Sequence, residues 1–370
     1  MQKKLIAMAV AGLASGAALA QSNVTVYGIV DMAYIRGAAD GADSRTFINS
    51  GGLSGSRLGF KGVEDLGNGL KAVFNLEWGM EVDQQLGLGQ VGSGAAVGTN
   101  SANGTTGTRN SFVGLAGGFG TVAAGRMQGA GYDFACATGP LAGGIFDAYN
   151  KVGLGGTQLL SCGGGGRANN AFAYLSPLFG GLSLAYNHVR VSEANAPGIA
   201  PIYPGTTGAT ARKMDDAYAN LFSVKYAAGP AAANFTYSKI TANDFLPDDI
   251  KELGLNGSFD MGVAKLFASY QTRKNDATGD KDKKWGVAAG IPVGPAGTVA
   301  VQYAKSNMDA NDTDSKGWSV AYIHGLSKRT TLYAGYNRIS NDDLVARAST
   351  ITPNAGGKSS TLGAGIRHSF

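Results

Sequence analysis

Basic side chains recur on one face of the alternating segments in this sequence. They are Arg57 and Lys61 in one segment, Arg109 in a second and Arg167 in a third. Fixed charges of one sign along a water-filled passage attract ions of the opposite sign and repel their own. These residues therefore predict an electrostatic filter for ions rather than a reaction centre.

Two aspartates lie in the long segment that precedes the last of these arginines. Asp133 and Asp147 are the only carboxylates between Arg126 and Arg167. Near 128–166 the chain is mostly glycine, alanine and small polar residues, and a structureless loop of that length inside a compact domain needs a reason. We expect this loop to fold into the lumen of a membrane β-barrel and to narrow it.

Reaction chemistry has little support in the sequence. A hydrolase needs a nucleophile beside a general base. His188 and His368 occupy outward-facing positions near expected strand ends, and His324, the remaining histidine, lies beside an expected turn. None of them shares an inner face with serine and aspartate, and no metal-ligand cluster or phosphate-loop spacing is present. We therefore expect no enzymatic activity, no metal and no cofactor.

The first twenty residues have the pattern of a secretory signal peptide. Lys3 and Lys4 precede an apolar run, and small residues follow up to an A-x-A site ending at Ala20. We expect cleavage near Ala20 and one mature domain, residues 21–370. Without the two lysines the mature chain has 29 basic and 26 acidic residues, and this small excess does not suggest nucleic acid.

Composition favours a β-barrel over a helical membrane protein. Beyond the leader no apolar run approaches the ~18 residues of a spanning helix, and the mean hydropathy is −0.04. Glycine makes up 58 of 370 residues, roughly 16% against a usual share of about 7%. Because glycine disfavours helix interiors and suits turns and barrel bends, we expect an all-β fold.

Period-two alternation gives the strands. After the turn near 62–69, apolar Phe74 and Leu76 alternate with polar residues, which is the strand signal. The polar face is expected to line the lumen and the apolar face, rich in aromatic rings, to meet lipid. Besides the basic residues, the inner-facing positions include Tyr27, Asp31, Asn75 and Glu77.

Turn lengths alternate along the chain and give the strand number. Short turns are expected near 62–69, 116–119, 176–181, 227–230, 258–262, 291–297 and 324–329. Longer polar stretches are expected near 37–44, 83–108, 128–166, 191–215, 241–249, 273–284, 306–316 and 340–358. Together they separate sixteen antiparallel strands with both termini in the periplasm. A soluble β-sandwich is the alternative, but it would not explain the asymmetry between short and long connections.

Several segments in order resemble the Gram-negative general-diffusion porins, most closely the beta-proteobacterial branch. They are SRLGFKGVEDLGNGLKAVFNLE (56–77), RNSFVGLAGGFGTVAAGR (109–126), LSKRT with the following LYAGY, and the C-terminal TLGAGIRHSF. The resemblance implies a homotrimeric outer-membrane channel for passive diffusion of small hydrophilic solutes. It also implies an inward-folded third extracellular loop and a terminal aromatic, here Phe370, that the barrel-assembly machinery reads.

The resemblance also assigns roles to the charged residues. Arg57, Arg109 and Arg167 match the contexts of a basic ladder that faces the third loop, although each could also be an isolated, solvated arginine. Asp147 matches the loop tip and is the first candidate for the opposing acid, ahead of Asp133. The expected result is weak anion preference, which the inner-facing carboxylates on the wall could offset.

Arg126 and the cysteines complete the expected site. Parity turns Arg126 outward, and the resemblance suggests that it lies in the subunit interface. Cys136 and Cys162, the only cysteines, are expected to pair because the periplasm is oxidising. Free thiols and pairing between chains are the alternatives.

Two other expectations concern partners and function. Lysines near 274–284 (Lys274, Lys281, Lys283 and Lys284) are candidates for contact with lipopolysaccharide. The same barrel could instead be a substrate-specific channel or a surface adhesin. A sugar-specific channel would show aromatic residues along the lumen wall, and here Tyr27 is the visible one.

Overall fold

The computed structural model describes residues 23–84, 90–91, 105–154, 158–190, 218–241 and 249–370. The expected signal peptide, residues 1–20, lies outside the described residues, as do the stretch near 191–215 and parts of three other expected loops. Among the described residues, no helix has both the length and the apolar character that a membrane crossing needs.

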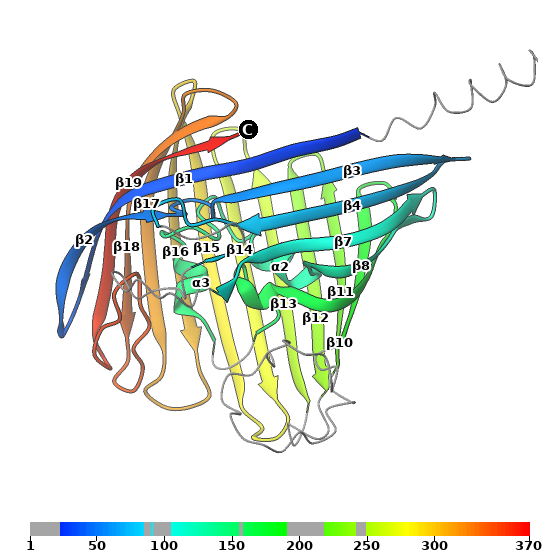
Figure 1. Cartoon of the computed structure of the whole chain (residues 1–370). Helices are drawn as coiled ribbons and strands as arrows, with labels where there is room; N and C mark the ends of the chain where they lie inside the picture. Colours follow the sequence, from blue (N-terminus) through cyan, green and yellow to red (C-terminus); the bar gives the residue numbers. More distant parts are fainter. Residues whose placement is uncertain (1–22, 85–89, 92–104, 155–157, 191–217, 242–248) are drawn as a thin grey trace, which may run out of the picture.

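Antiparallel strands form one sheet that closes on itself (Figure 1). From β3 onward each strand of this sheet pairs with the following one, β2 and β3 both pair with β1, and β19 pairs back onto β1. The strands are β1 (Asn23–Ala39), β2 (Ala42–Ser50), β3 (Arg57–Gly67), β4 (Leu70–Gly79), β7 (Thr108–Gly117), β8 (Gly120–Gln128), β9 (Arg167–Leu175), β10 (Leu182–Arg190), β11 (Tyr218–Ala228), β12 (Ala231–Thr241), β13 (Ile250–Asp260), β14 (Lys265–Asn275), β15 (Lys281–Val293), β16 (Gly297–Asn307), β17 (Ser315–Gly325), β18 (Thr330–Asn341) and β19 (Lys358–Ser369). A separate two-stranded ribbon pairs β5 (Gln90–Val91) with β6 (Thr105–Thr106).

One strand position in the barrel is shared by two segments. The C-terminal half of β1 pairs with β2, and the N-terminal half pairs with β3. The seventeen strands of the sheet therefore make a barrel of sixteen positions, which confirms the expected fold. Between β2 and β3 the backbone at 51–56 leaves the ladder, and this interruption positions part of the site described below.

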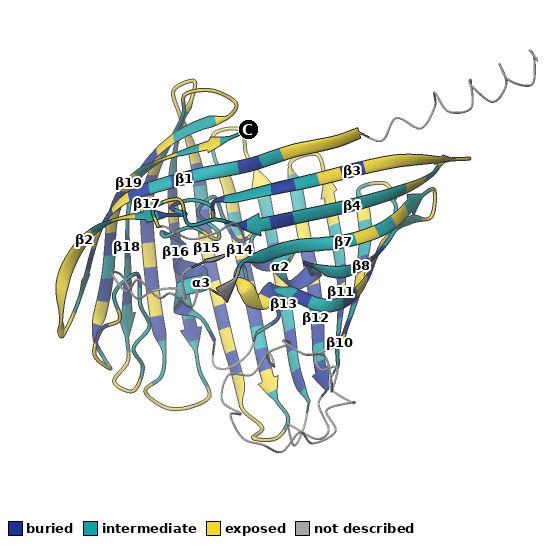
Figure 2. Cartoon of the chain, viewed as in Figure 1, coloured by how far each residue is buried: buried dark blue, intermediate teal, exposed yellow. Residues whose placement is uncertain are grey.

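The two faces of the wall differ as the alternation predicted. In β15, Trp285 and Val287 are exposed on the outside, while Lys284 and Gly286, which alternate with them, are buried on the inside. The expected grouping of Lys284 with the surface lysines is thus corrected. Figure 2 shows this alternation along many of the strands. Pairs of aromatic rings lie on the outer face, with centroids 5.5 Å apart for Trp285 and Tyr303, and 5.2 Å apart for Trp318 and Tyr336. Such rings are typical of the lipid-facing belt of a barrel.

The connections between the described strands lie where the sequence predicted them, with one clear exception. All seven expected short turns occur between consecutive strands. The expected longer stretch near 37–44 is wrong, because β1 and β2 extend through it and leave only Asp40 and Gly41 as the turn. Gly41 has φ +78°, a conformation that glycine adopts readily in tight turns.

The main apolar clusters lie between the wall and the segment 129–166, which we call the inner segment. It contains α2 (Ala130–Ala135), α3 (Ala148–Val152) and the 3₁₀ turn η1 (Gly164–Gly166). Phe134 of α2 and Leu160 pack with residues of β8 to β13 in one cluster, and Tyr149 and Val152 of α3 pack with β16 and β18 in another. The inner segment is therefore part of the packed structure.

Candidate functional site

Polar side chains on the inner face of the wall hold the backbone of the inner segment. Gln302 accepts a hydrogen bond from the Ala148 amide (2.9 Å), and Asn256 donates to the Phe134 carbonyl (2.7 Å). Ser319 donates to the Phe146 carbonyl at 2.5 Å. In Figure 1, α2 and α3 lie between the strands of the front wall and those of the back wall. These contacts fix the inner segment across the interior of the barrel.

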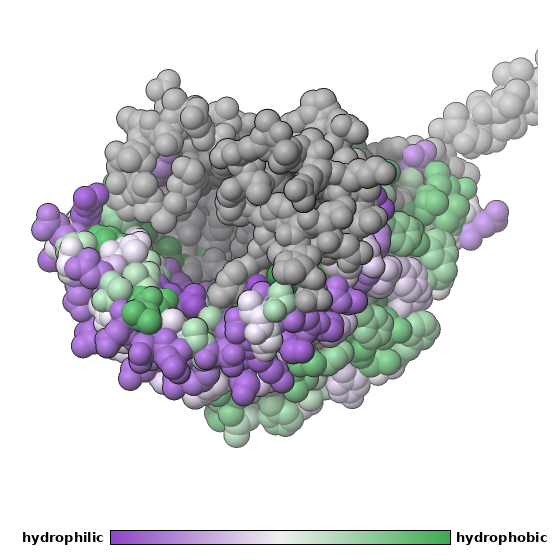
Figure 3. Space-filling model, turned by 90° about the horizontal axis from the view of Figure 1, so that it is seen from below, coloured by the Kyte–Doolittle hydropathy of each residue, from purple (hydrophilic) through white to green (hydrophobic). Residues whose placement is uncertain are grey.

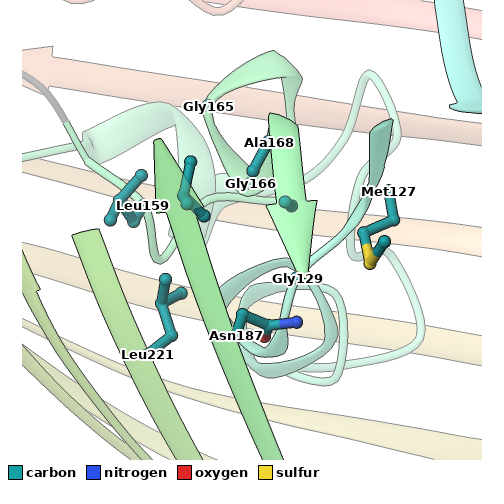
Figure 4. A pocket seen from close by; sticks show the side chains of 10 residues that line it. Met127, Gly129, Leu159, Gly165, Gly166, Ala168, Asn187 and Leu221 are labelled. Carbon is teal, nitrogen blue, oxygen red and sulfur yellow. The ribbon is translucent and has the colours of Figure 1, made fainter. Parts of the chain in front are cut away.

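Glu252 of β13 anchors the returning part of the inner segment. Its buried carboxylate accepts hydrogen bonds from the amides of Leu159 (2.7 Å) and Leu160 (3.2 Å), and from Ser238 (3.2 Å). Figure 4 shows Leu159 beside a small pocket that Asn187 and other wall residues complete. A buried carboxylate with several donors is a specific attachment point, because water cannot replace those donors there.

A disulfide between Cys136 and Cys162 closes the inner segment on itself, which confirms the expected pairing. The Cα atoms are 4.9 Å apart and the sequence separation is 26. In the chain-entropy model, closure of a loop of this length stabilises the fold by about 3–4 kcal/mol. After Cys162 the chain passes close to its own backbone, since a Cβ at Gly166 would lie 2.0 Å from the Ser161 carbonyl oxygen. Glycine is therefore needed at the end of this run, at Gly166 and at Gly165, where a Cβ would lie 2.5 Å from the Gln158 carbonyl oxygen.

Glu77 is the acid at the centre of the basic wall. Its Oε1 lies 2.5 Å from Nε of Arg109 and 4.0 Å from Nη1 of Arg57. The Glu77 side chain is 7% exposed, against 13% for Arg109 and 18% for Arg57. The arginines thus keep access to solvent while the carboxylate between them is nearly enclosed.

A change of register brings Arg109 to Glu77. Val113 and Leu115 of β7 are exposed on the outer face, so an unbroken strand would point Arg109 outward as well. The pairing of β7 with β4 shifts by one residue beyond Leu76. Such a shift turns the following side chains to the opposite face. Arg109 therefore faces the lumen, as expected, but because of an irregularity that the alternation alone does not contain.

Arg126 pairs with Ser111 of β7, on the same parity as Ala124 and the exposed Val113, and its place in a subunit interface stays a prediction. The pairing of β8 with β9 shifts between Gly125 and Met127, but the extra residue lies in β9, so the parity of Arg126 is unchanged. Arg126 donates to the Thr108 carbonyl and to Asn169 Oδ1, both at 2.6 Å. Its guanidinium is held by these neighbours instead of standing free on the outer surface.

Arg167 lies over the ring of Tyr132 in α2. The centre of its guanidinium is 4.5 Å from the ring centroid, and Nη1 donates to the Gly163 carbonyl at 3.4 Å. This cation–π contact joins the wall to the inner segment. Arg109, Arg126 and Arg167 line one cavity of about 400 Å³, so three guanidinium groups meet at the same water-accessible space.

Glu81 lines the same cavity beyond the end of β4. Burial, together with repulsion from Asp83, raises the pKa of Glu81 to about 7. Its carboxyl group is therefore largely neutral below that pH and largely charged above it. The net charge around the three arginines changes over this range.

Tyr27, Asn75 and Lys61 lie next to the Glu77 group. The Tyr27 hydroxyl donates to Glu77 at 3.0 Å and lies 3.2 Å from Asn75 Oδ1. The Lys61 ammonium lies over the Tyr27 ring, 5.1 Å from the centroid. The structure therefore brings these three predicted inner-facing residues together.

Asp31 is inner-facing but is not open to the passage. It is fully buried, and its carboxylate accepts hydrogen bonds from the amides of Gly52 (3.1 Å), Leu53 (2.9 Å) and Ser54 (2.8 Å). The Tyr333 hydroxyl also donates to it. The expected role of Asp31 in offsetting the arginines is corrected, because this carboxylate fixes the interruption between β2 and β3.

The two loop aspartates do not face the arginines either. Asp147 is 1% exposed and caps the N-terminus of α3, where it accepts from the amides of Asn150 (3.2 Å) and Gly143 (2.7 Å). Asp133 pairs with Lys225 of β11. The expectation of an acidic loop opposite a basic ladder is therefore corrected: the carboxylate among the arginines is Glu77, on the wall itself.

Lys225 and Tyr132 are site residues that the sequence interpretation missed. Lys225 lies on the inner parity of β11, next to the outward Val224 and Tyr226, so alternation could have found it. Tyr132 has no comparable signal, because its position depends on how α2 lies in the barrel.

Comparisons with known proteins agree with this architecture. Residues 7–344 match the family model described as Gram-negative porin. Outer membrane porin protein 32 of Delftia acidovorans is 34% identical, with all of both chains covered. An outer membrane porin protein of Bordetella pertussis is 26% identical, also over the whole of both chains.

A solved structure of similar shape is an anion-selective porin from Comamonas acidovorans. It has a TM-score of 0.75 and 29% sequence identity, and the alignment covers 95% of this chain and 100% of that one. The family match, the full-length relatives and the closed barrel with polar contacts inside support one assignment. The chain belongs to the Gram-negative porins, which form channels in the outer membrane.

Proposed function

We propose that each barrel conducts small hydrophilic solutes and ions by passive diffusion, with a weak preference for anions. The observation that carries this proposal is the grouping of arginines on one side of the interior. Arg57 and Arg109 share Glu77, while Arg126 and Arg167 join Arg109 around one cavity. The anion-selective porin that the chain resembles supports the same sign.

The charge balance around the passage favours anions. Asp133 and Asp147 are occupied by Lys225 and by the N-terminus of α3, so they contribute little negative field beside the arginines. Because arginine keeps its charge at all accessible pH values, the local excess is positive. A positive wall lowers the energy of a passing anion and raises that of a cation.

We also propose that the barrel has no enzymatic activity. The histidines have partners other than a catalytic pair: His188 lies 2.9 Å from Asn220, and His324 lies 3.1 Å from the Tyr322 hydroxyl. His368 lies 2.9 Å from Thr330. In the described part of the chain, no group of three or more possible metal ligands occurs.

Assembly forms a further part of the proposal. Residues 1–20 are proposed as the cleaved signal peptide, the mature chain as a homotrimer, and Phe370 as the residue that the assembly machinery reads. The last residue pairs with Gly28 through two backbone hydrogen bonds of 3.2 Å, so it completes the closure between β19 and β1. Its side chain is 44% exposed and remains accessible in the closed barrel.

The test is the zero-current potential of the purified protein in a planar bilayer under a tenfold KCl gradient. We expect ohmic conductance steps in groups of three and a potential whose sign indicates chloride preference. Potassium preference would leave the channel in place and overturn the charge assignment. Absence of conductance would overturn the channel itself and favour the adhesin alternative.

A further inference from the structure

A cavity of about 260 Å³ lies inside the barrel between α2 and the wall that β4 and β7 to β10 form. It is separate from the cavity of the arginines. Thr121 and Leu175 are among its lining residues, so it extends from α2 toward the short turns. We call it the amide niche, after the carboxamide side chains of Asn110 and Asn187, which also line it.

Three alanines on neighbouring strands leave room for the niche. Ala123 of β8 pairs with Ala173 of β9, which in turn pairs with Asn187 of β10, and Ala185 lies two residues before Asn187 on the same face. All three alanines line the niche. Because an alanine side chain is a single carbon, the inner surface of the wall is low at this place and a space remains under α2.

Two carboxamides present donors to this space in fixed orientations. Asn187 Oδ1 accepts from the Ala130 amide at 2.8 Å, and Asn110 Oδ1 accepts from the Gln128 amide at 3.0 Å. Neither amide nitrogen has a hydrogen-bond partner among the described residues, although Asn187 is only 5% exposed. In Figure 4 the Asn187 nitrogen points to the side on which Met127 lies. A carboxamide whose oxygen is bound to the backbone keeps its N–H groups directed at the niche.

An acceptor and an apolar surface complete the niche. Asp133 lines its edge, with a side chain that is 45% exposed, and Phe112 and Met127 contribute apolar surface from β7 and β8. Small-molecule sites combine apolar lining with a few placed polar groups in this way. A monosaccharide suits the combination, because its hydroxyl groups donate and accept around its edge whereas its C–H groups contact apolar surface.

The charge of the niche differs from that of the arginine cavity. Within the described part of the chain, Asp133 is the one charged residue that lines the niche, and it pairs with Lys225. The arginine cavity is lined by three guanidinium groups instead. An anion is therefore attracted to the arginines, whereas a neutral solute can use the hydrogen-bonding groups of the niche without competition from ions.

The entrance of the barrel does not make this distinction. Seen from the end that carries the longer connections, hydrophilic side chains gather along the rim and hydrophobic ones on the outer wall (Figure 3). We propose that the amide niche binds neutral monosaccharides, so that the barrel has separate sites for neutral and anionic solutes. Its volume is near the lower end of the roughly 300–1,000 Å³ of small-molecule sites, which suits one hexose. The inference rests on the proposed function, because the solute reaches the niche through the passage.

The test measures the binding of D-glucose to the full-length protein in detergent by saturation-transfer NMR. Ala185→Leu fills the niche without changing a charge. The matched control is Ala232→Leu, at an inward alanine of β12 that lines the cavity beside Lys225. We expect the dissociation constant for D-glucose to rise at least about tenfold in Ala185→Leu and to stay unchanged in the control. Equal binding by wild type and Ala185→Leu would overturn the proposal.

A second variant tests the donors. Asn187→Asp keeps an oxygen that accepts from the Ala130 amide and replaces the N–H groups with a further acceptor. Binding of D-glucose should again weaken about tenfold, since a buried donor is lost and an acceptor is left in its place. If Ala185→Leu does not fold, this variant decides the question, and undiminished binding in it would contradict the proposal.

Two other solutes define the class that is bound. D-gluconate has the size of glucose but carries a carboxylate, so its binding should depend on the arginines and should be equal in wild type and Ala185→Leu. Sucrose should not compete with D-glucose, because a disaccharide exceeds the niche. Competition by sucrose, or a loss of gluconate binding in Ala185→Leu as large as that of D-glucose, would overturn the assignment to neutral monosaccharides.

Channel measurements separate this inference from the proposed function. Ala185→Leu should keep the wild-type zero-current potential, since it leaves the arginine wall unchanged. A chloride-selective channel that does not bind D-glucose would overturn this inference alone. A barrel that binds D-glucose but does not conduct would overturn the proposed function instead.

Discussion

Two groups of positive charge in this barrel are held in opposite ways. The inner arginines are fixed by a nearly enclosed carboxylate, by backbone carbonyls and by an aromatic ring. On the outer face, Lys239, Lys251 and Lys274 lie opposite one another on neighbouring strands, and their partners are aspartates of the connecting loops. Arginine has a rigid fork with several donors, whereas lysine is a flexible point charge. The difference indicates a fixed field inside the channel and an adaptable surface outside it.

Among the tests of this comparison, removal of the disulfide in the inner segment should have the largest effect on stability. Replacement of both Cys136 and Cys162 by Ser should lower the free energy of unfolding by about 3 kcal/mol, because the unfolded chain regains the freedom of the closed loop. Denaturant unfolding in detergent measures this change, and single-channel recordings should become noisier. Identical traces and identical unfolding would show that the wall contacts alone fix the inner segment.

Removing Arg109, the close partner of Glu77, should lower the free energy of unfolding by about as much as removing the disulfide. Arg109→Ala leaves the nearly enclosed carboxylate of Glu77 with the Tyr27 hydroxyl and with Arg57, 4.0 Å away, as its only cationic partner, so we expect about 3 kcal/mol of destabilisation. The matched variant on the outer face is Lys251→Ala, which removes one exposed partner of Asp276 and should hardly change the stability. Equal effects in the two variants, measured by denaturant unfolding, would contradict the distinction between fixed and adaptable charges.

Ion preference should depend on the inner group alone. One charge at ~4 Å in water changes the energy of an ion by about 1 kcal/mol, so Glu77→Gln should raise the chloride-to-potassium permeability ratio by roughly threefold to fivefold. Arg167→Ala should lower it by a similar factor. Asp147→Asn should leave it unchanged, because this carboxylate caps α3. Reversal potentials that shift only in the Asp147 variant would reverse our assignment of the central acid.

The smallest expected effect is a pH dependence at Glu81. Its pKa of about 7 means that raising the pH through neutrality adds one negative charge beside Arg109 and Arg167. Anion preference should therefore decrease modestly as the pH rises, and Glu81→Gln should remove the change. A slope of the reversal potential that persists in the Glu81→Gln variant would assign the titration to another group.

Local sequence patterns were sufficient to predict the barrel fold. Strand alternation, the short turns and the two cysteines are properties of neighbouring residues or of compartment, and the sequence carries them directly. Arg57 and Glu77 were placed correctly for the same reason. The tight turn at Asp40 and Gly41 was missed because polar residues in extended strands resemble a loop.

The orientation and partners of the charged side chains inside the barrel could not be predicted in the same way. The register shift that turns Arg109 inward involves a single residue of β7, and no local preference marks it. Asp147 could have been recognised as a helix cap, since it precedes the short helical run AYNKV. Asp31 has no such signal, because its partners at 52–54 depend on how β2 and β3 separate.

Because β19 pairs with β1, the barrel cannot close after export until the last part of the chain is in place. These strands join residues more than 300 positions apart in sequence, from Ile29 with Ser369 to Ala39 with Ser359. Until they meet, the sheet has two open edges whose unpaired backbone groups can recruit other chains. A product truncated before β19 would keep both edges permanently and should aggregate or be degraded, so completeness of the chain is tested by closure itself.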